Sequence, residues 1–236
     1  MKLALLDALL TARRERATAA VVTQLADGAQ KLVLRNGSFG ELELSEQELT
    51  LVQHAIEADR SQVMQLPTRE LFVEVWSAPV RLFIVGAVHV AQSLVPIAQL
   101  TGLDVVVIDP RSSFASEARF PGTELMVEWP DSAIAKLQPD RRTAVVTLTH
   151  NPRFDDAALV AALRSDAFYI GALGSRRTHE QRRQRLAQAG FDEIAQRRIR
   201  APIGLAIGAS SPSEIALAIG AELVAVLRSA PAAARI

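Results

Sequence analysis

A glycine- and arginine-rich segment near residue 174 has the residue types that bind an anion. Gly171 and Gly174 border an apolar stretch, and Ser175, Arg176 and Arg177 follow just before a helical pattern begins. Backbone amides at the start of a helix, the helix dipole and guanidinium groups all favour negative charge such as that of a phosphate. The alternative is a flexible loop with solvated arginines. We expect an anion site, because both glycines border a strand that should be buried.

A second glycine turn, Gly86-Ala87-Val88-His89, follows the apolar run 82–85. A buried strand, a tight glycine turn and a helix that faces an anion make up the first half of a dinucleotide-binding βαβ unit. About twenty residues later another apolar run ends on Asp109, which either contacts a ribose or caps a turn together with Arg111. Val88 replaces the glycine that lets the backbone approach a pyrophosphate, so the turn does not favour ordinary NAD binding.

Polar residues also follow the apolar run 143–149. His150 and Asn151 come first, and Asp155 and Asp156 stand close behind. His150 is either a binding residue or a strand-end histidine that bonds to the backbone, and the sequence leaves both interpretations open. We expect the two aspartates in the first turn of a helix, where acidic side chains suit the dipole, rather than on a metal. The sequence predicts no catalytic residue and no metal ligand.

A long segment after residue 108 holds Phe114-Ala115 and Arg119-Phe120-Pro121. Long loops in compact domains are often functional lids. The alternative, which we favour, is that the two phenylalanines anchor the loop in the core.

The elements that position these residues alternate between strands and helices from about residue 80 onward. Repeated βα units predict an α/β fold with a Rossmann-like, doubly wound parallel sheet. Ligands bind such a sheet outside the carboxyl ends of its strands, at the point where the strand order reverses. The predicted strands are 82–86, 104–108, 125–129, 143–149, 168–173 and 199–203, and the predicted helices are 88–100, 131–138, 155–165, 178–189 and one that begins at Ser211.

The domain prediction is a small α+β module over 1–79 and a Rossmann-like domain over 80–236. In the module, Ser45 and Glu48 form a capping box that predicts the start of a helix. The other expected elements are a helix over 2–16, a hairpin of strands 19–23 and 31–34, and strands near 62–66 and 70–76. We find no recognisable chemistry in this module.

Composition excludes several classes of protein. The 26 basic and 26 acidic residues give zero net charge, which argues against nucleic acid or an anionic membrane as a partner. Cysteine is absent, so disulfides, thiolate metal sites and a cysteine nucleophile are excluded. No apolar run reaches the roughly 18 residues of a membrane span. The N-terminal stretch reads as an amphipathic helix rather than a signal peptide, and we expect a cytoplasmic protein.

Several motifs in order give the chain a family resemblance. It resembles the XdhC/CoxI family, which are accessory proteins of molybdenum hydroxylases such as xanthine dehydrogenase. The family's motifs are G-A-G-H-V-A, D-x-R, F-A…R-F-P, T-H-D-P…D-D, G-A-L-G-S-R-R-T and A-P-I-G-L-D-I-G. They correspond here to residues 86–91, 109–111, 114–121, 149–156, 171–178 and 201–208. The resemblance covers about two thirds of the chain.

The sequence departs from the family in a few places. Val88, Asn151 and Ala206 replace a glycine and two aspartates, and the family's S-G-G-C cysteine is absent. The resemblance implies a chaperone that binds molybdenum cofactor, as molybdopterin or its dinucleotide form. It also implies as partners a target molybdenum hydroxylase and a cysteine desulfurase or sulfurtransferase, with a homodimer as a further option.

Three functions remain under consideration. The favoured one is a cofactor-binding chaperone that assists maturation and insertion of molybdenum cofactor and catalyses no reaction. The first alternative is a docking module with a decayed nucleotide site, and the second is an NAD(P)-dependent oxidoreductase. The predicted cofactor-binding residues are Gly86, Ala87, His89, Asp109, Arg111, His150, Asn151, Gly171, Gly174, Ser175, Arg176 and Arg177.

Overall fold

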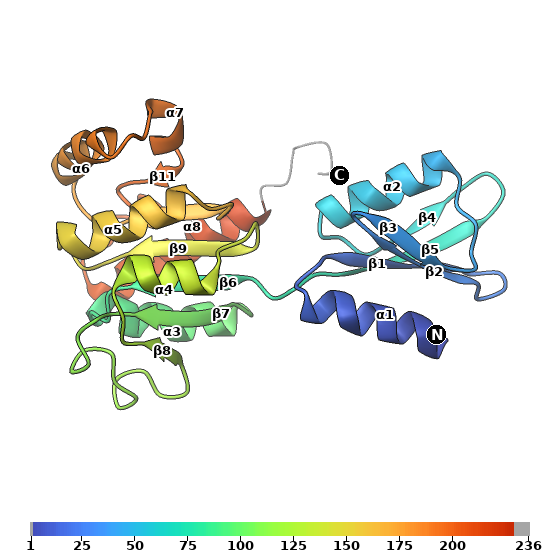
Figure 1. Cartoon of the computed structure of the whole chain (residues 1–236), viewed down its shortest axis with the longest axis horizontal. Helices are drawn as coiled ribbons and strands as arrows, with labels where there is room; N and C mark the ends of the chain where they lie inside the picture. Colours follow the sequence, from blue (N-terminus) through green and yellow to red (C-terminus); the bar gives the residue numbers. More distant parts are fainter. Residues whose placement is uncertain (1, 229–236) are drawn as a thin grey trace. The chain divides into compact units, whose positions relative to one another are not determined.

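The computed structural model describes residues 2–228, and the chain forms two compact units (Figure 1). The first unit ends at Ala78 and the second begins at Pro79. The end of the predicted second domain, from Ser229, lies outside the described residues. Among the residues that are described, no helix is both long enough and apolar enough to cross a membrane.

The first unit is an antiparallel sheet between two helices. Its strand order is β3-β2-β1-β5-β4. Successive side chains of a strand point to opposite faces, so Ala19 and Val21 pack with α1 while Ala20 and Val22 pack with α2. The elements are α1 (Leu3–Arg14), β1 (Ala19–Gln24), β2 (Gln30–Leu34), β3 (Gly37–Gly40), α2 (Glu46–Glu57), β4 (Gln62–Gln65) and β5 (Glu70–Trp76).

Local sequence signals predicted most of this unit. The hairpin of β1 and β2 and the capping box of Ser45 and Glu48 are confirmed. Strand β3 was not predicted, because its sequence Gly-Ser-Phe-Gly has two glycines and all four residues are exposed. It pairs with β2 at the edge of the sheet.

The second unit is built on a parallel sheet of six strands in the order β11-β10-β9-β6-β7-β8. This order confirms the predicted Rossmann-like topology. The order reverses at β6, which pairs with β7 on one side and β9 on the other. The strands are β6 (Arg81–Val85), β7 (Asp104–Ile108), β8 (Glu124–Met126), β9 (Thr143–Thr147), β10 (Tyr169–Ala172) and β11 (Ile199–Arg200).

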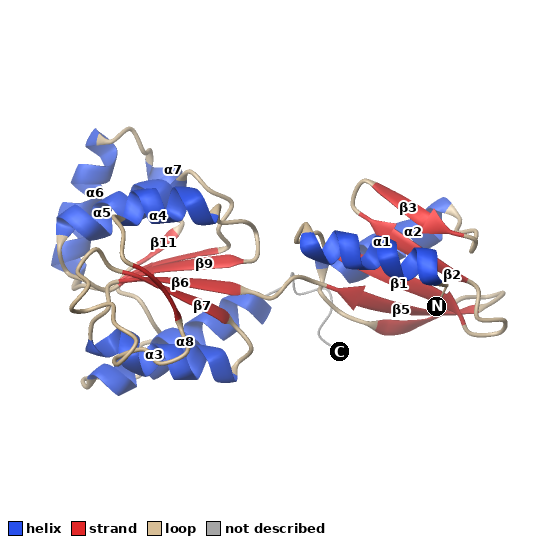
Figure 2. Cartoon of the chain, turned by 60° about the horizontal axis from the view of Figure 1, so that its bottom comes forward, coloured by secondary structure: helices blue, strands red, loops and turns tan. Residues whose placement is uncertain are grey.

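Helices cover both faces of this sheet (Figure 2). Leu82 and Ile84 of β6 pack into the cluster under α3 and α8, whereas Phe83 and Val85 pack into the cluster under α4, α5 and α6. Burial on both faces explains why these strands are continuous apolar runs. The helices are α3 (His89–Leu100), α4 (Pro130–Leu137), α5 (Pro152–Leu163), α6 (Arg176–Gln188), α7 (Glu193–Gln196) and α8 (Pro212–Arg228).

Two helices begin earlier than predicted because their caps lie further upstream. Asn151 caps α5, and Pro152 takes its first position, where a proline loses no helical hydrogen bond. Ser175 caps α6 and accepts a hydrogen bond from the Thr178 N–H. The short helix α7 was not predicted. Helix α3 runs through Pro96 to Leu100.

Candidate functional site

The glycine turn after β6 lies against the loop after β9. Gly86 has a φ of 110°, a conformation that side chains rarely adopt. A Cβ on Gly86 would lie 2.6 Å from Cγ2 of Thr149 and 3.2 Å from its backbone nitrogen. Two separate constraints therefore require glycine here. The close approach of Gly86 to Thr149 brings together the loops after β6 and β9, which lie where the strand order reverses.

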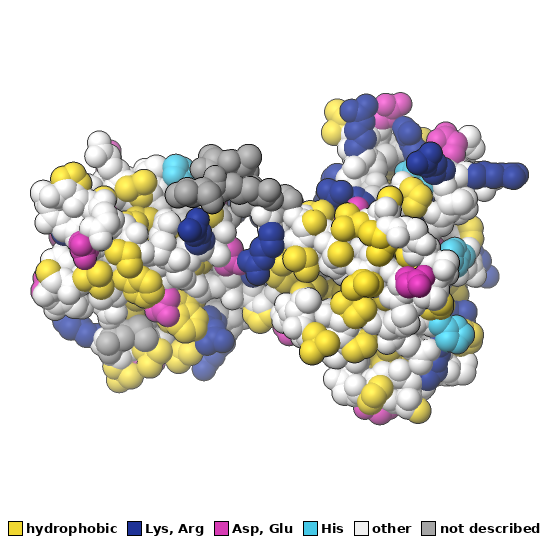
Figure 3. All heavy atoms as spheres, turned by 180° about the vertical axis from the view of Figure 1, so that it is seen from behind, with side chains coloured by type: hydrophobic (Ala, Val, Ile, Leu, Met, Phe, Trp, Pro, Cys, Tyr) yellow, Lys and Arg dark blue, Asp and Glu magenta, His cyan; other side chains and the backbone are white. Residues whose placement is uncertain are grey.

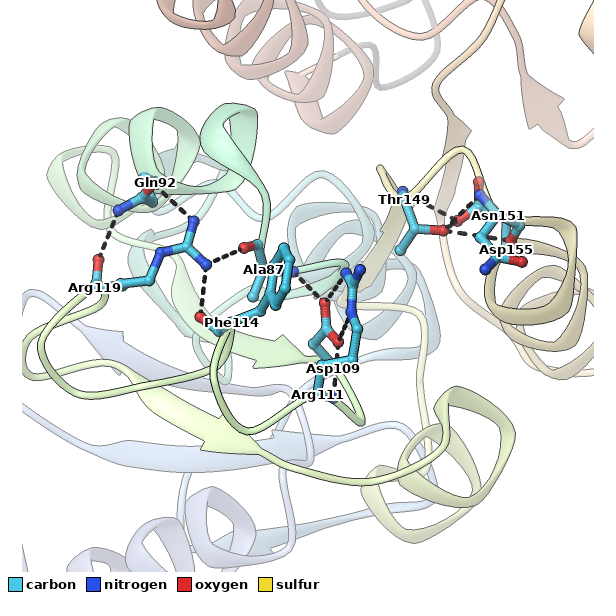
Figure 4. Close-up of polar contacts among 9 residues, drawn as sticks. All are labelled: Ala87, Gln92, Asp109, Arg111, Phe114, Arg119, Thr149, Asn151 and Asp155. Atoms are coloured by element: carbon cyan, nitrogen blue, oxygen red, sulfur yellow. Dashed lines mark hydrogen bonds and ion pairs between the residues drawn. The ribbon is translucent and has the colours of Figure 1, made fainter.

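Asp109, at the end of β7, is fully buried and holds this turn in place (Figure 4). Its Oδ2 accepts hydrogen bonds from the Ala87 N–H at 2.9 Å and from Arg111 Nη2 at 2.7 Å. Its Oδ1 accepts from the backbone N–H and Nε of Arg111, at 3.0 and 2.9 Å. Burial alone would raise the pKa of Asp109, but these hydrogen bonds outweigh it and lower the pKa. Of the two predicted roles of Asp109, these contacts fit the cap of a turn together with Arg111, because both carboxylate oxygens already accept hydrogen bonds within the protein.

Arg119 closes the long loop after β7 onto the same turn (Figure 4). Its Nη1 donates to the carbonyl oxygens of Ala87 at 2.8 Å and Phe114 at 2.9 Å, and its Nη2 donates to Gln92 Oε1 at 3.0 Å. Phe120 is 1% exposed and anchors the loop in the core as we expected, whereas Phe114 is 38% exposed. Arg119 was not among the predicted site residues.

The two residues after Ala87 differ in their surroundings. Val88 has an extended backbone, with φ of −96° and ψ of 177°, so no glycine is required there for conformation. Its half-buried side chain packs against the cluster under α3 and α8. His89 is the first residue of α3 and is exposed.

The loop after β9 is organised by a buried carboxylate. Oδ1 of Asp155 accepts from the Thr149 hydroxyl at 2.6 Å and from the Thr149 N–H at 3.2 Å (Figure 4). The Asn151 N–H donates to the same hydroxyl, and Asn151 Oδ1 caps α5. His150, between them, is exposed and has a φ of 58°. Of the two aspartates predicted in the first turn of a helix, Asp155 lies in the first turn of α5, and its side chain bonds Thr149 in the preceding loop. Asp156 follows that turn and pairs with Arg185 of α6.

The predicted anion loop presents two exposed guanidinium groups at the start of α6. Gly174 has a φ of 141°, and the Ser175 hydroxyl caps the helix. Arg176 and Arg177 follow in the first turn, and within the described residues neither has a hydrogen bond or an ion pair. Lys and Arg side chains gather over α6 and α7 in the space-filling view (Figure 3). Because both charges are uncompensated, they are available to an anion.

A buried arginine beneath this loop was not predicted. Arg182 is 2% exposed, and its Nη2 donates to the Leu173 carbonyl at 3.0 Å and lies 3.8 Å from Asp155 Oδ2. Burial raises the pKa of Asp155 and lowers that of Arg182. Across residues 2–228, Nε and Nη1 of Arg182 and Oδ2 of Asp155 find no hydrogen-bond partner. The pair connects the loop after β10 with the loop after β9.

Gly171 differs from the other predicted site residues because it lies inside strand β10. A Cβ there would come within 2.4 Å of the Ile203 side chain and 2.8 Å of the Tyr169 ring. The glycine therefore makes room for core packing, and it is buried.

Apart from Gly171, the predicted residues thus lie in the loops or the first helical turns that follow β6, β7, β9 and β10, which are neighbours in the sheet. Two cavities lie elsewhere: a small apolar one between α3 and α8, and an open one at the amino ends of β6 and β7. Neither is lined by a predicted site residue, so we place the candidate site by its chemistry. Within the described residues no group of three or more His, Asp or Glu side chains is arranged to hold a metal ion.

A parallel sheet in this order, with a glycine turn at its reversal point, defines a Rossmann-type nucleotide-binding fold. The model of the XdhC Rossmann domain matches residues 82–223, and the chain belongs to this family.

Curated relatives match the chain over part of their own length. It is 35% identical over 147 residues to the molybdenum cofactor insertion chaperone PaoD of Escherichia coli, covering 62% of this chain and 40% of PaoD. It is 32% identical to the uncharacterized protein YqeB of E. coli, over 68% of this chain and 30% of YqeB. It is 29% identical to a probable xanthine dehydrogenase subunit of Bacillus subtilis, over 66% of this chain and 46% of that protein. The chain spans less than half the length of these relatives.

A solved structure extends the likeness beyond the Rossmann unit. A xanthine dehydrogenase from Bacillus halodurans superposes with a TM-score of 0.70 at 26% identity, covering 98% of this chain and 65% of that one.

Proposed function

We propose that this chain binds molybdenum cofactor and assists its maturation and insertion into a molybdenum hydroxylase of the xanthine dehydrogenase type. The observation that carries the proposal is the pair of exposed guanidinium groups of Arg176 and Arg177, which are unpaired within the described residues. They lie at the start of α6 in the Rossmann unit of an XdhC-family chain. The similarity to a molybdenum cofactor insertion chaperone supports it.

The donor set of the loops fits a pterin with a phosphate or nucleotide tail. Arg176 and Arg177 would hold the phosphate by charge-assisted hydrogen bonds at the start of α6. His89, His150 and Asn151 would contact the pterin or the oxo ligands of the metal. No thiolate contact to molybdenum is available, because the sequence has no cysteine. The bound cofactor carries the redox chemistry of the enzyme that receives it, and this chain needs only to bind and release it.

The second candidate is a docking module with a decayed nucleotide site, which binds only the target enzyme or a sulfurtransferase. It is favoured by Asp109, whose oxygens are bonded to Arg111 and Ala87 and are fully buried. The same observation weighs against an NAD(P)-dependent oxidoreductase, since a ribose would find no free carboxylate there. We propose no dehydrogenase activity.

Calorimetric titration of the full chain with molybdenum cofactor, NAD and NADP tests these alternatives. We expect saturable binding of the cofactor and none of the nicotinamides. In Arg176→Ala/Arg177→Ala the binding free energy should weaken by about 2–4 kcal/mol, if both groups make charge-assisted bonds. The matched control is Arg13→Ala/Arg14→Ala, which removes an adjacent arginine pair from α1.

Each outcome selects one function. Binding of NAD alone would favour the oxidoreductase. No binding of any of the three ligands would favour the docking module. Equal affinity in the Arg176→Ala/Arg177→Ala variant and the wild type would remove the α6 loop from the site.

A further inference from the structure

Five planar side chains lie next to one another beside the glycine turn, and we call this group the planar row. The Arg111 guanidinium lies 3.9 Å from the ring centre of Phe114 and 5.6 Å from that of Phe154. The Phe154 and Trp129 ring centres are 5.3 Å apart, with 62° between the ring planes. The Arg153 guanidinium lies 5.5 Å from the Trp129 ring centre.

The row draws on three segments at the carboxyl edge of the sheet. Arg111 and Phe114 come from the loop after β7, Trp129 directly precedes α4 after β8, and Arg153 and Phe154 lie in the first turn of α5 after β9. Nucleotide ligands of such sheets bind at this edge. The row is also joined directly to the glycine turn, because Asp109 bonds both Ala87 and Arg111 (Figure 4).

Two aromatic side chains of the row are exposed, whereas Phe154 and Arg111 are half-buried. Trp129 is 46% exposed and Phe114 is 38% exposed, and neither belongs to the clusters that form the core. The Arg111 guanidinium donates two hydrogen bonds to Asp109, from Nε to Oδ1 and from Nη2 to Oδ2, and these fix the orientation of its plane. The rings of Phe114 and Trp129 thus keep part of their apolar surface in water, although Arg119 also lies 5.5 Å from the Phe114 ring centre. Because the Arg111 side chain is held in place before a ligand binds, binding loses less side-chain entropy than it would at a mobile arginine.

Exposed aromatic rings and guanidinium planes are the kinds of groups on which nucleobases stack. The arginines add attraction for the π-face and for a neighbouring phosphate. We propose that the planar row binds the nucleobase of a nucleotide, and specifically the base at the end of the tail in the dinucleotide form of molybdenum cofactor. This assignment rests on the proposed function, and it selects the dinucleotide form over molybdopterin.

The chain offers a built-in reporter for this binding. It has two tryptophans, and Trp76 lies in the first unit, so Trp76→Phe leaves Trp129 as the single tryptophan fluorophore. We would titrate that variant with cytidine and guanosine monophosphate, and measure affinity by calorimetry and stacking by quenching of Trp129. Ribose 5-phosphate, which lacks a base, is the matched ligand. We expect saturable quenching with the nucleotides and none with the sugar phosphate.

Shortened side chains locate the site. Phe114→Leu and Trp129→Leu should each weaken nucleotide binding about tenfold, since stacking on one aromatic side chain contributes roughly that much. Phe39→Leu removes an aromatic side chain of similar exposure, 48%, from the first unit, and should leave affinity unchanged. Arg111 is left intact in this series because it also supports the glycine turn.

Titration with nucleotide-free molybdopterin separates this inference from the proposed function. If molybdopterin binds while neither mononucleotide does, the planar row is no base site and the proposed function stands. If the mononucleotides bind at the row while both cofactor forms fail to bind, the proposed function fails and the base site remains. Equal binding of ribose 5-phosphate, or a Trp129 response only to a purified xanthine dehydrogenase-type enzyme, would overturn the inference in favour of an anion site or a protein-docking surface.

Discussion

The buried carboxylate of Asp109 accepts a hydrogen bond from the backbone N–H of Ala87, 22 residues earlier in the chain, at 2.9 Å. An acidic residue at the end of β7 therefore contributes to the shape of the glycine turn after β6. In nucleotide-binding sheets an acidic residue at this position bonds the ribose. Here it accepts hydrogen bonds from the backbone of Ala87 and from Arg111 instead.

Asp109→Asn should destabilise the second unit by about 2–4 kcal/mol, because it removes a buried charge that faces four donors and leaves Arg111 unpaired. Urea unfolding of the full chain, followed by Trp129 fluorescence in the Trp76→Phe background, measures the change. The control is Asp104→Asn, at the exposed first residue of β7, which should change the free energy of unfolding by less than about 0.5 kcal/mol. A similar small shift for Asp109→Asn would show that this carboxylate does not hold the turn.

Gly86→Ala combines a strained φ of 110° with a clash against Thr149, and it should cost about 3 kcal/mol or more. Gly122→Ala is the matched control, since Gly122 has a φ of 67° but open space around its Cα. That variant should cost about 1 kcal/mol from strain alone. Thermal unfolding of both variants separates the two effects.

A second substitution isolates the contact with Thr149. Thr149→Ser removes Cγ2, the nearest atom at 2.6 Å, and retains the hydroxyl that bonds Asp155. In the Gly86→Ala background it should restore part of the lost stability. Full additivity of the two changes would mean that the side chains do not meet.

Glu48 gives the first unit an acid-sensitive contact. Hydrogen bonds from Arg69 at 2.8 and 2.7 Å, together with the capping box, lower the pKa of Glu48 from 4.5 to about 2. Because the pKa of Glu48 is lower in the folded than in the unfolded chain, its ionised form stabilises the fold at pH values above the unfolded pKa. This stabilisation is lost as the pH falls through about 2. Between pH 5 and pH 2 the Glu48→Gln variant should therefore lose about 2 kcal/mol less of its free energy of unfolding than wild type loses.

Trp76 fluorescence in a Trp129→Phe background follows this unfolding, because Trp76 lies in the first unit. Glu46→Gln, in the same turn of α2 but exposed, is the control and should keep the wild-type pH profile. Parallel profiles for Glu48→Gln and wild type would contradict the assignment.

Removal of Arg182 should make the stability of the second unit fall as the pH rises above about 4. Burial already raises the pKa of Asp155, and the loss of the nearby guanidinium in Arg182→Met raises it further. An acid whose folded pKa is raised binds more protons when folded, so stability falls as the pH rises through that window. The melting temperature of Arg182→Met should therefore drop more steeply than that of wild type from about pH 4 upward. Arg177→Met, at an exposed position on the same helix, should follow the wild-type profile.

The order of elements could be predicted because it depends on local patterns. Buried parallel strands such as β6 and β9 are short apolar runs, and the capping box of Ser45 and Glu48 marks a helix start. These signals lie within a few residues of each element. They were sufficient for the fold class and for the loops on which the candidate site lies.

The contacts of the site could not be predicted in the same way, because they join residues far apart in the sequence. The role of Asp109 stayed open until its bond to Ala87 was seen, and the loop holding Arg119 folds back on the same residue. Arg182 stands in a helix whose residues are mostly charged or polar, so no apolar stripe indicated that its guanidinium is buried. The planar row likewise draws its members from three segments.

The central place of β6 also sets an order of events during synthesis. Its two partners, β7 and β9, are completed at Ile108 and Thr147, so a nascent chain that ends between them has β6 paired along one edge only. An unpaired inner edge of this apolar strand is a template for association with other chains. The glycine turn acquires its neighbour Thr149 just after that edge is covered. The arrival of β9 and the loop after it therefore both covers this edge against aggregation and completes the surroundings of the glycine turn.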